Sequence, residues 1–184
     1  HDMGYYDLRV AVNVSGRQIE DRQFPEIVRE TLELYALDAE RLELELTESV
    51  MLEAAADELG IIEHLREIGV SISIDDFGTG YSSFRYLQEF PVQCLKIDRS
   101  LVATFDADVN QDRGRSGLAI ARAIVTLGEG LCIRIVAEGI ETHDQFDAVR
   151  QLGCDEIQGF LFSKPVPFSE TTLMLKNGVD LTSV

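Results

Sequence analysis

Short stretches of alternating apolar and polar residues recur along the chain and predict β-strands. In residues 42–46 the leucines share one face, and Glu43 and Glu45 share the other, because successive side chains of a strand point to opposite sides. The strand candidates are residues 8–14, 42–46, 70–75, 94–97, 132–137 and 155–158, with a short extended segment near 160–163. Apolar residues at helical spacing predict helices over 24–36, 50–68, 116–128 and 143–152, the last beginning after Thr142 and ending at Gly153.

Strands that alternate with helices at this spacing predict an α/β fold with a parallel sheet, either an open doubly wound sheet or a barrel. A doubly wound sheet is covered by helices on both faces, so both faces of its strands are apolar. Here one face of each strand carries polar residues, which a barrel accepts on its inner face because its helices lie only outside. The alternation therefore favours a TIM-like barrel.

Polar residues on this face gather where the predicted strands end. They are Asn13, Glu45, Asp75, Lys96, Glu138 and Gln158. Any one of them is explained by capping of the helix that follows, but six on one face are difficult to explain that way. The carboxyl ends of barrel strands are also where barrel active sites lie. We therefore expect these side chains to form a site.

The acidic residues of this set determine the chemistry that the site can perform. Carboxylates held close together repel one another, and divalent cations relieve that repulsion. Carboxylate and amide oxygens suit Mg²⁺, Mn²⁺ or Ca²⁺. Asp76, next to Asp75, is either a further ligand or a cap of the following loop. A pair of such ions is typical of phosphodiester hydrolysis, with Lys96 holding the water or the phosphate. The residues alone indicate a metal-dependent hydrolase or lyase.

The amino-acid composition limits the kinds of partner that the protein can bind. The 184 residues include 16 Lys and Arg against 33 Asp and Glu, which gives a formal net charge of −17. This excess of acid argues against binding to a nucleic-acid polymer, which requires clustered cations. No apolar stretch is long enough to cross a membrane, and the three widely spaced cysteines predict reduced core residues in a cytoplasmic protein.

Six segments together resemble the EAL-domain family, the bacterial phosphodiesterases that hydrolyse cyclic di-GMP. In chain order they are VNVS (12–15), ELTES (45–49), DDFGTGYSS (75–83), LKID (95–98), AEGIET (137–142) and QGFLFSKP (158–165). The resemblance spans nearly the whole chain. It implies a TIM-like barrel of the EAL type, Mg²⁺ or Mn²⁺ as the cofactor with two ions in the complete domain, and linear pGpG as the product of second-messenger signalling.

The resemblance also implies roles for single residues. The expected metal ligands are Asn13, Glu45 and Asp75, with Asp76 bridging or binding the second ion. Lys96 resembles the lysine that positions the attacking water, and Glu138 resembles an essential glutamate that acts as ligand or base.

Further residues are expected to support the site. The supporting residues are Gln158, Glu48, Asp98 and Glu141, with Glu48 bracing the loop that follows Asp76. The expected loop residues are Phe77, Gly78, Thr79 and Gly80, which the resemblance links to metal binding and to a homodimer.

Two departures from the family are visible. The Glu-Ala-Leu motif is absent, so we expect residues 1–184 to be a single EAL-type domain that lacks its first strand and the helices that follow. The parent protein is expected to carry sensory or cyclase domains upstream. Residues 105–117 predict a surface insertion. Because one metal ligand is missing, the alternative function is a catalytically weak sensor that binds cyclic di-GMP.

Overall fold

The computed structural model describes residues 4–54, 56–78, 87, 92–105 and 112–177. The chain divides into two compact units, His1–Leu95 and Lys96–Val184. The boundary falls inside strand β4 (Cys94–Ile97), so this strand contributes to both units. Each unit is described by itself below.

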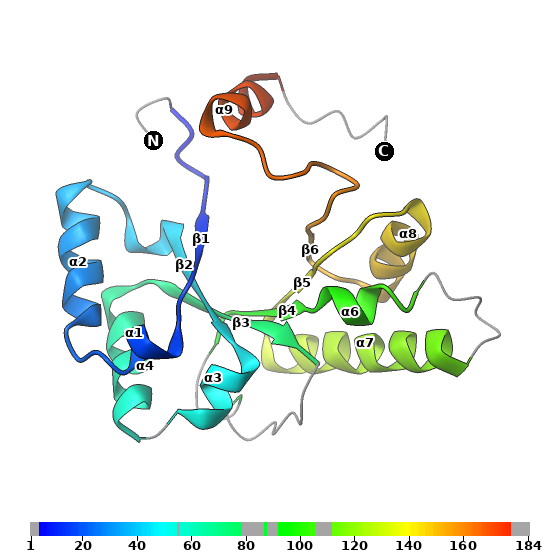
Figure 1. The fold of residues 1–184 in the computed structure, drawn as a ribbon, viewed down its shortest axis with the longest axis horizontal. Coiled ribbons are helices and arrows are strands. Elements are labelled where there is room, and N and C mark those ends of the chain that lie inside the picture. The colour runs from blue at the N-terminus through cyan, green and yellow to red at the C-terminus, as the bar shows by residue number, and fades with distance from the viewer. Residues whose placement is uncertain (1–3, 55, 79–86, 88–91, 106–111, 178–184) are drawn as a thin grey trace. The chain divides into compact units, whose positions relative to one another are not determined.

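The first unit is a parallel sheet with helices between its strands (Figure 1). Strand β1 (Val10–Asn13) pairs in parallel with β2 (Leu42–Thr47), and β2 pairs in parallel with β3 (Ser71–Phe77). The strand order is β1-β2-β3-β4. The helices are α1 (Gly16–Ile19), α2 (Phe24–Leu34), the short 3-10 helix η1 (Ala39–Arg41), α3 (Glu48–Glu53) and α4 (Ala56–Ile68).

The core of the first unit lies where α2 and α4 pack together and where the apolar faces of β2 and β3 are covered. Leu46, Ile74 and Leu65 have no exposed surface. Strand β1 differs because it lies at the end of the strand order, and its Val10 is 62 % exposed. The apolar face of β1 therefore contributes much less to the core than those of its neighbours.

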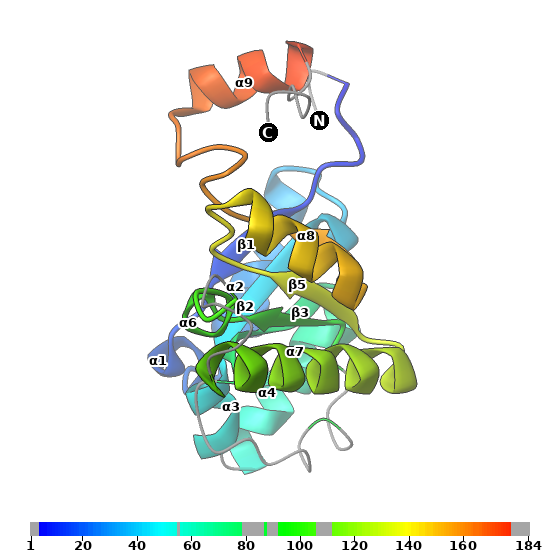
Figure 2. The same cartoon turned by 90° about the vertical axis from the view of Figure 1, so that its right-hand side faces the viewer.

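The second unit begins with the end of β4 and continues the strand order as β4-β5-β6. Strands β5 (Arg134–Ala137) and β6 (Glu156–Ile157) are parallel. The long helix α7 packs against α6, β5 and α8, and Figure 2 shows α8 beside β5. The helices are α6 (Arg99–Val102), α7 (Asp112–Leu131), α8 (His143–Leu152) and α9 (Phe168–Asn177).

Helix α8 begins and ends where the sequence predicts. The Thr142 side chain accepts a hydrogen bond from the backbone N–H of Gln145 at 3.2 Å, and the Gln145 side chain completes a capping box. Gly153 ends the helix in the left-handed conformation with φ of 88°, which a residue without Cβ adopts at little cost.

The predicted α/β fold is confirmed, and all six main strand candidates contain strands. In both units neighbouring strands are also neighbours in the chain, without the reversal of order that defines a doubly wound sheet. This topology agrees with the barrel interpretation. Among the described residues no helix is long and apolar enough to cross a membrane.

Several predicted elements are corrected by the structure. The extended segment near 160–163 is a turn, and the helix predicted over 50–68 is two helices because Ala54 has extended backbone angles. Helix α7 begins at Asp112, so the end of the 105–117 insertion is helical, while residues 106–111 lie outside the described part. Helix α9 was not predicted.

The cysteines are only partly core residues. Cys94 is buried in β4, whereas Cys132 is exposed. Cys154 lies between these extremes, and burial raises the pKa of its thiol to about 11. The prediction of three core cysteines was therefore wrong for Cys132, which lies just before β5.

Candidate functional site

In the first unit, Asn13 and Glu45 stand opposite each other at the ends of adjacent strands. The parallel register pairs Asn13 with Glu45, and neighbouring strands lie about 4.8 Å apart. The Glu45 side chain is buried, with 7 % of the residue exposed, while Asn13 is exposed because β1 is at the end of the strand order. An amide and a carboxylate are thus held at one end of the sheet by backbone pairing alone.

Asp75 and Asp76 lie near the end of β3. The register pairs Thr47 with Asp75, so Asp75 is two residues beyond the partner of Glu45. Asp76 has a φ of 56°, and its N–H donates a hydrogen bond of 2.9 Å to Oδ1 of Asp75. Aspartate is among the residues that accept this left-handed conformation. The conformation interrupts the regular alternation of faces where the two carboxylates occur.

Glu48 holds the start of the loop that follows. Its carboxylate is buried at the beginning of α3, and Oε2 accepts a hydrogen bond from the Gly78 N–H at 3.2 Å. Phe77 is buried just before, and Gly78 has a φ of 95°, a conformation that favours glycine. The expected loop residues Thr79 and Gly80 lie outside the described residues.

In the second unit, Lys96 and Glu138 form an ion pair. Lys96 is only 5 % exposed, and its Nζ lies 2.5 Å from Oε1 of Glu138. The backbone N–H of Glu138 donates to the carbonyl of Ile97 at 3.1 Å, which aligns the ends of β4 and β5. A buried lysine loses its hydration, so a carboxylate at this distance offsets much of the desolvation cost. The pair is a fixed element of the site.

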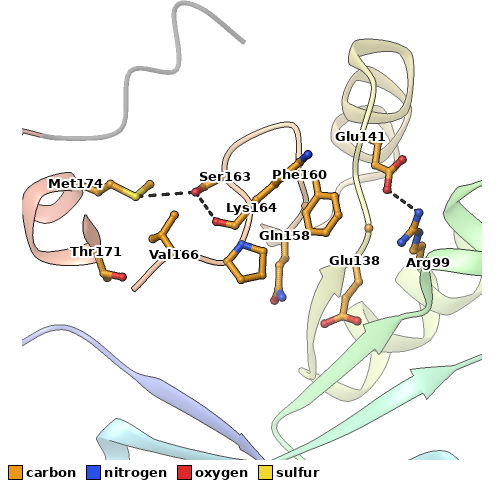
Figure 3. Close-up of a pocket in the computed structure, with 13 residues that line it drawn as sticks. Arg99, Glu138, Glu141, Gln158, Phe160, Ser163, Lys164, Val166, Thr171 and Met174 are labelled. Carbon is orange, nitrogen blue, oxygen red and sulfur yellow. Dashed lines mark hydrogen bonds and ion pairs between the residues drawn. The ribbon is translucent and has the colours of Figure 1, made fainter. Parts of the chain in front are cut away.

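Gln158 directly follows β6 and lines a pocket of about 460 Å³ (Figure 3). Its N–H donates to the carbonyl of Ala137, and its carbonyl accepts from the N–H of Ile140. Figure 3 shows the side chains of Glu138 and Gln158 pointing in the same direction. The Nζ of Lys164 lies 5.9 Å from the centre of the Phe160 ring on the wall of this pocket.

The two remaining candidates, Asp98 and Glu141, make different contacts. Asp98 caps α6, because its Oδ1 accepts a hydrogen bond from the Ser100 N–H at 2.8 Å. Glu141 pairs with Arg99, whose Nη2 lies 2.6 Å from Glu141 Oε1. The sequence reasoning missed Arg99, although it directly follows the LKID segment, and it did not single out Phe160 or Lys164 within QGFLFSKP.

The structure thus brings together Asn13 with Glu45 in the first unit and Lys96 with Glu138 in the second. Within the described residues no three His, Cys, Asp or Glu side chains form a cluster able to hold a metal ion. The carboxylates of Glu45, Asp75 and Asp76 therefore form no such cluster by themselves, and Asn13 adds an amide oxygen at the end of β1.

Replacing Gly159 by alanine is expected to disrupt the segment that carries Gln158. A Cβ at position 159 would lie 2.0 Å from the carbonyl oxygen and 2.3 Å from the nitrogen of Ile140, so the backbone itself must move. We expect a loss of about 3 kcal/mol in the free energy of unfolding, measured by urea denaturation. Gly60→Ala is the control, because nothing lies within 4 Å of a Cβ there. Equal stability of the two variants would contradict this packing.

Comparisons with known proteins place most of the chain among relatives of one family. A family model described as EAL domain matches residues 2–165. The bifunctional diguanylate cyclase/cyclic di-GMP phosphodiesterase MucR of Pseudomonas aeruginosa is 43% identical over 166 residues, which are 90% of this chain and 23% of that protein. The chain spans only about a fifth of the length of the curated relatives that it matches.

Two solved structures extend the comparison. The PaMucR phosphodiesterase in complex with c-di-GMP is 42% identical with a TM-score of 0.85, covering 92% of this chain and 66% of that chain. The Klebsiella pneumoniae BlrP1 manganese/cy-diGMP complex is 28% identical with a TM-score of 0.75, covering 85% and 39%. The fold is therefore the TIM-like α/β fold of these proteins.

Proposed function

The chain belongs to the EAL domain family, and from this membership we propose that it hydrolyses cyclic di-GMP to linear pGpG in bacterial second-messenger signalling. The observation that carries the proposal is the buried Lys96–Glu138 pair beside the pocket that Glu138 and Gln158 line. A lysine paired in this way is suited to a reaction in which a water must be held next to a phosphate.

The donors of the first unit support a divalent cation as the cofactor. Asn13, Glu45 and Asp75 offer only oxygen ligands, which suit Mg²⁺ or Mn²⁺ better than softer metals. The register of β1 and β2 already sets the first two side by side. We assign the metal to these residues, with Asp76 for a second ion. When bound, such ions acidify water and offset the charge of the phosphate.

The candidate residues of the second unit bind and orient the substrate. Oxygen from water adds to phosphorus, and the bond from phosphorus to the ribose 3′ oxygen breaks, which leaves pGpG with a free 3′ hydroxyl. Lys96 holds the attacking water, and Glu138 fixes the lysine and accepts a proton from that water. The leaving 3′ oxygen takes up a proton from solvent. Gln158 hydrogen-bonds a substrate oxygen. Lys96 supplies part of the positive charge that a dianionic substrate requires on a protein with a net charge of −17.

The setting of the domain is also part of the proposal. The relatives are several times longer than the chain. One of them, MucR, is named as a bifunctional diguanylate cyclase/cyclic di-GMP phosphodiesterase. We propose that the domain works within a larger signalling protein, next to sensory or cyclase domains, as a homodimer. Its location would be the cytoplasm, where the proposed second messenger acts.

The test is hydrolysis of cyclic di-GMP by the full-length protein, followed by chromatography of pGpG. We expect turnover with Mg²⁺ or Mn²⁺, none after treatment with EDTA, and recovery when either ion is added back. Calorimetry is run on the same samples. Binding of cyclic di-GMP without turnover in the presence of metal would contradict the proposed enzymatic function and favour the sensor alternative. Absence of both binding and turnover would contradict both functions.

A further inference from the structure

Two ion pairs stand three residues apart in the second unit. Lys96 pairs with Glu138, and three residues later on each segment Arg99 pairs with Glu141. The first pair is buried, whereas Arg99 and Glu141 are both well exposed, with 61 % of the Arg99 side chain accessible. Exposed pairs contribute little to stability, so the second pair calls for another explanation.

The stem of Arg99 also lies across the backbone that joins the two glutamates. A Cβ at Gly139 would lie 2.3 Å from Cγ and 2.6 Å from Cβ of Arg99, so only glycine fits beneath the stem. Gly139 also has a φ of 70°, a conformation that glycine adopts without strain. The Arg99 stem therefore packs directly on the residue that follows Glu138.

The same backbone is held from a second direction. Ile140 is fully buried, its N–H donates to the Gln158 carbonyl, and its carbonyl accepts from the Leu161 N–H. Figure 3 shows Arg99 meeting Glu141 beside this segment, with Glu138 extending from the end of β5. Arg99 thus packs against one side of the 138–141 segment. The 158–161 segment is hydrogen-bonded to the same segment through Ile140.

We propose that Arg99 is a positioning residue of the site: it clamps the 138–141 segment through Gly139 and Glu141 and so keeps the Glu138 carboxylate on Lys96. The proposal rests on the proposed hydrolysis, but the clamp itself is a property of the fold. Arginine suits the role because its long stem covers Gly139 while its planar head reaches Glu141.

The kinetic test uses Arg99→Met, which keeps a straight apolar stem and removes the charge. We expect kcat to fall about tenfold, as is usual when a residue that orients a site residue is lost, with KM within about twofold. Glu141→Gln is expected to match it, and the double variant to lose no more than either alone. Arg99→Lys is expected to restore most of kcat. Arg122→Met, an exposed arginine on α7, is the matched control.

Amide hydrogen exchange tests the clamp without any turnover. In Arg99→Met the amides of Glu138 and Ile140 are expected to exchange about tenfold faster than in the wild type, while that of Ile133, bonded to the Gly128 carbonyl, stays unchanged. Unchanged exchange at Glu138 and Ile140 would overturn the proposal. A rise in KM with kcat preserved would also overturn it, because Arg99 would then bind substrate directly. Faster exchange in Arg99→Met, together with a wild type that shows no turnover, would contradict the proposed function and leave the clamp supported.

Discussion

Replacing Glu45 by glutamine is expected to reduce metal-dependent hydrolysis of cyclic di-GMP by about 1000-fold. Glu45 is a buried carboxylate at the end of β2, in register with Asn13. Glutamine keeps the size of the side chain but removes the negative charge that would hold a divalent cation. A loss of several kcal/mol in transition-state stabilisation corresponds to this factor. The measurement is the rate of pGpG formation at saturating Mn²⁺.

The matched control for this variant is Glu43→Gln. Glu43 lies two residues earlier on the same strand and the same face, is equally buried, and is 3.9 Å from Arg9. It does not lie at the carboxyl end of the strand, so we expect Glu43→Gln to keep most of its turnover. Similar losses in the two variants would show that any buried charge on β2 is needed for folding, and would remove the argument for a metal ligand at Glu45.

Replacing Lys96 by methionine is expected to reduce turnover strongly and to destabilise the protein. Methionine fills similar space but leaves Glu138 without its lysine partner in a largely buried position. Breaking a buried ion pair from one side typically costs about 3 kcal/mol in the free energy of unfolding. Turnover is expected to fall about 1000-fold because the attacking water loses its cation. Urea denaturation and the hydrolysis assay measure the two effects separately.

A double-mutant cycle makes this prediction specific. Lys96→Met/Glu138→Gln removes both charges, so it is expected to regain much of the stability that Lys96→Met loses while remaining inactive. Lys176→Met, which replaces an exposed lysine on α9, is the control for the loss of one positive charge. A double variant less stable than either single variant would contradict the pairing of Lys96 with Glu138.

The strands and their faces could be predicted because alternation is a local property. The parity of residues 42–46 separates Glu43 and Glu45 from the leucines, and the structure buries two of these leucines, Leu44 and Leu46, in the core of the first unit. The caps of α8 were also predictable, because Thr142 and Gly153 act on the backbone next to them. Segments that depend on the backbone angles of single residues could not be predicted in this way. Ala54 divides one predicted helix into two, and residues 160–163 form a turn.

The candidate site, too, could be predicted only in part from the sequence. The sequence marked Lys96 and Glu138 through their places at strand ends, but 42 positions of chain separate them, and only the strand order brings them to 2.5 Å. Asp98 was expected to support the site, and the structure shows that it caps α6.

The sequence by itself determined which residues alternate, which type of fold they build, and which acids, amide and lysine occupy the strand ends. These follow from side-chain polarity and spacing, which the chain carries before it folds. Only the tertiary structure decided that Lys96 is buried against Glu138 and that Arg99 lies over Gly139. Contacts of this kind depend on how distant segments pack, and no local pattern encodes the distance between them. Arg99 shows the difference most directly. Neither its residue type nor its position in the chain indicates that it contacts Gly139 and Glu141.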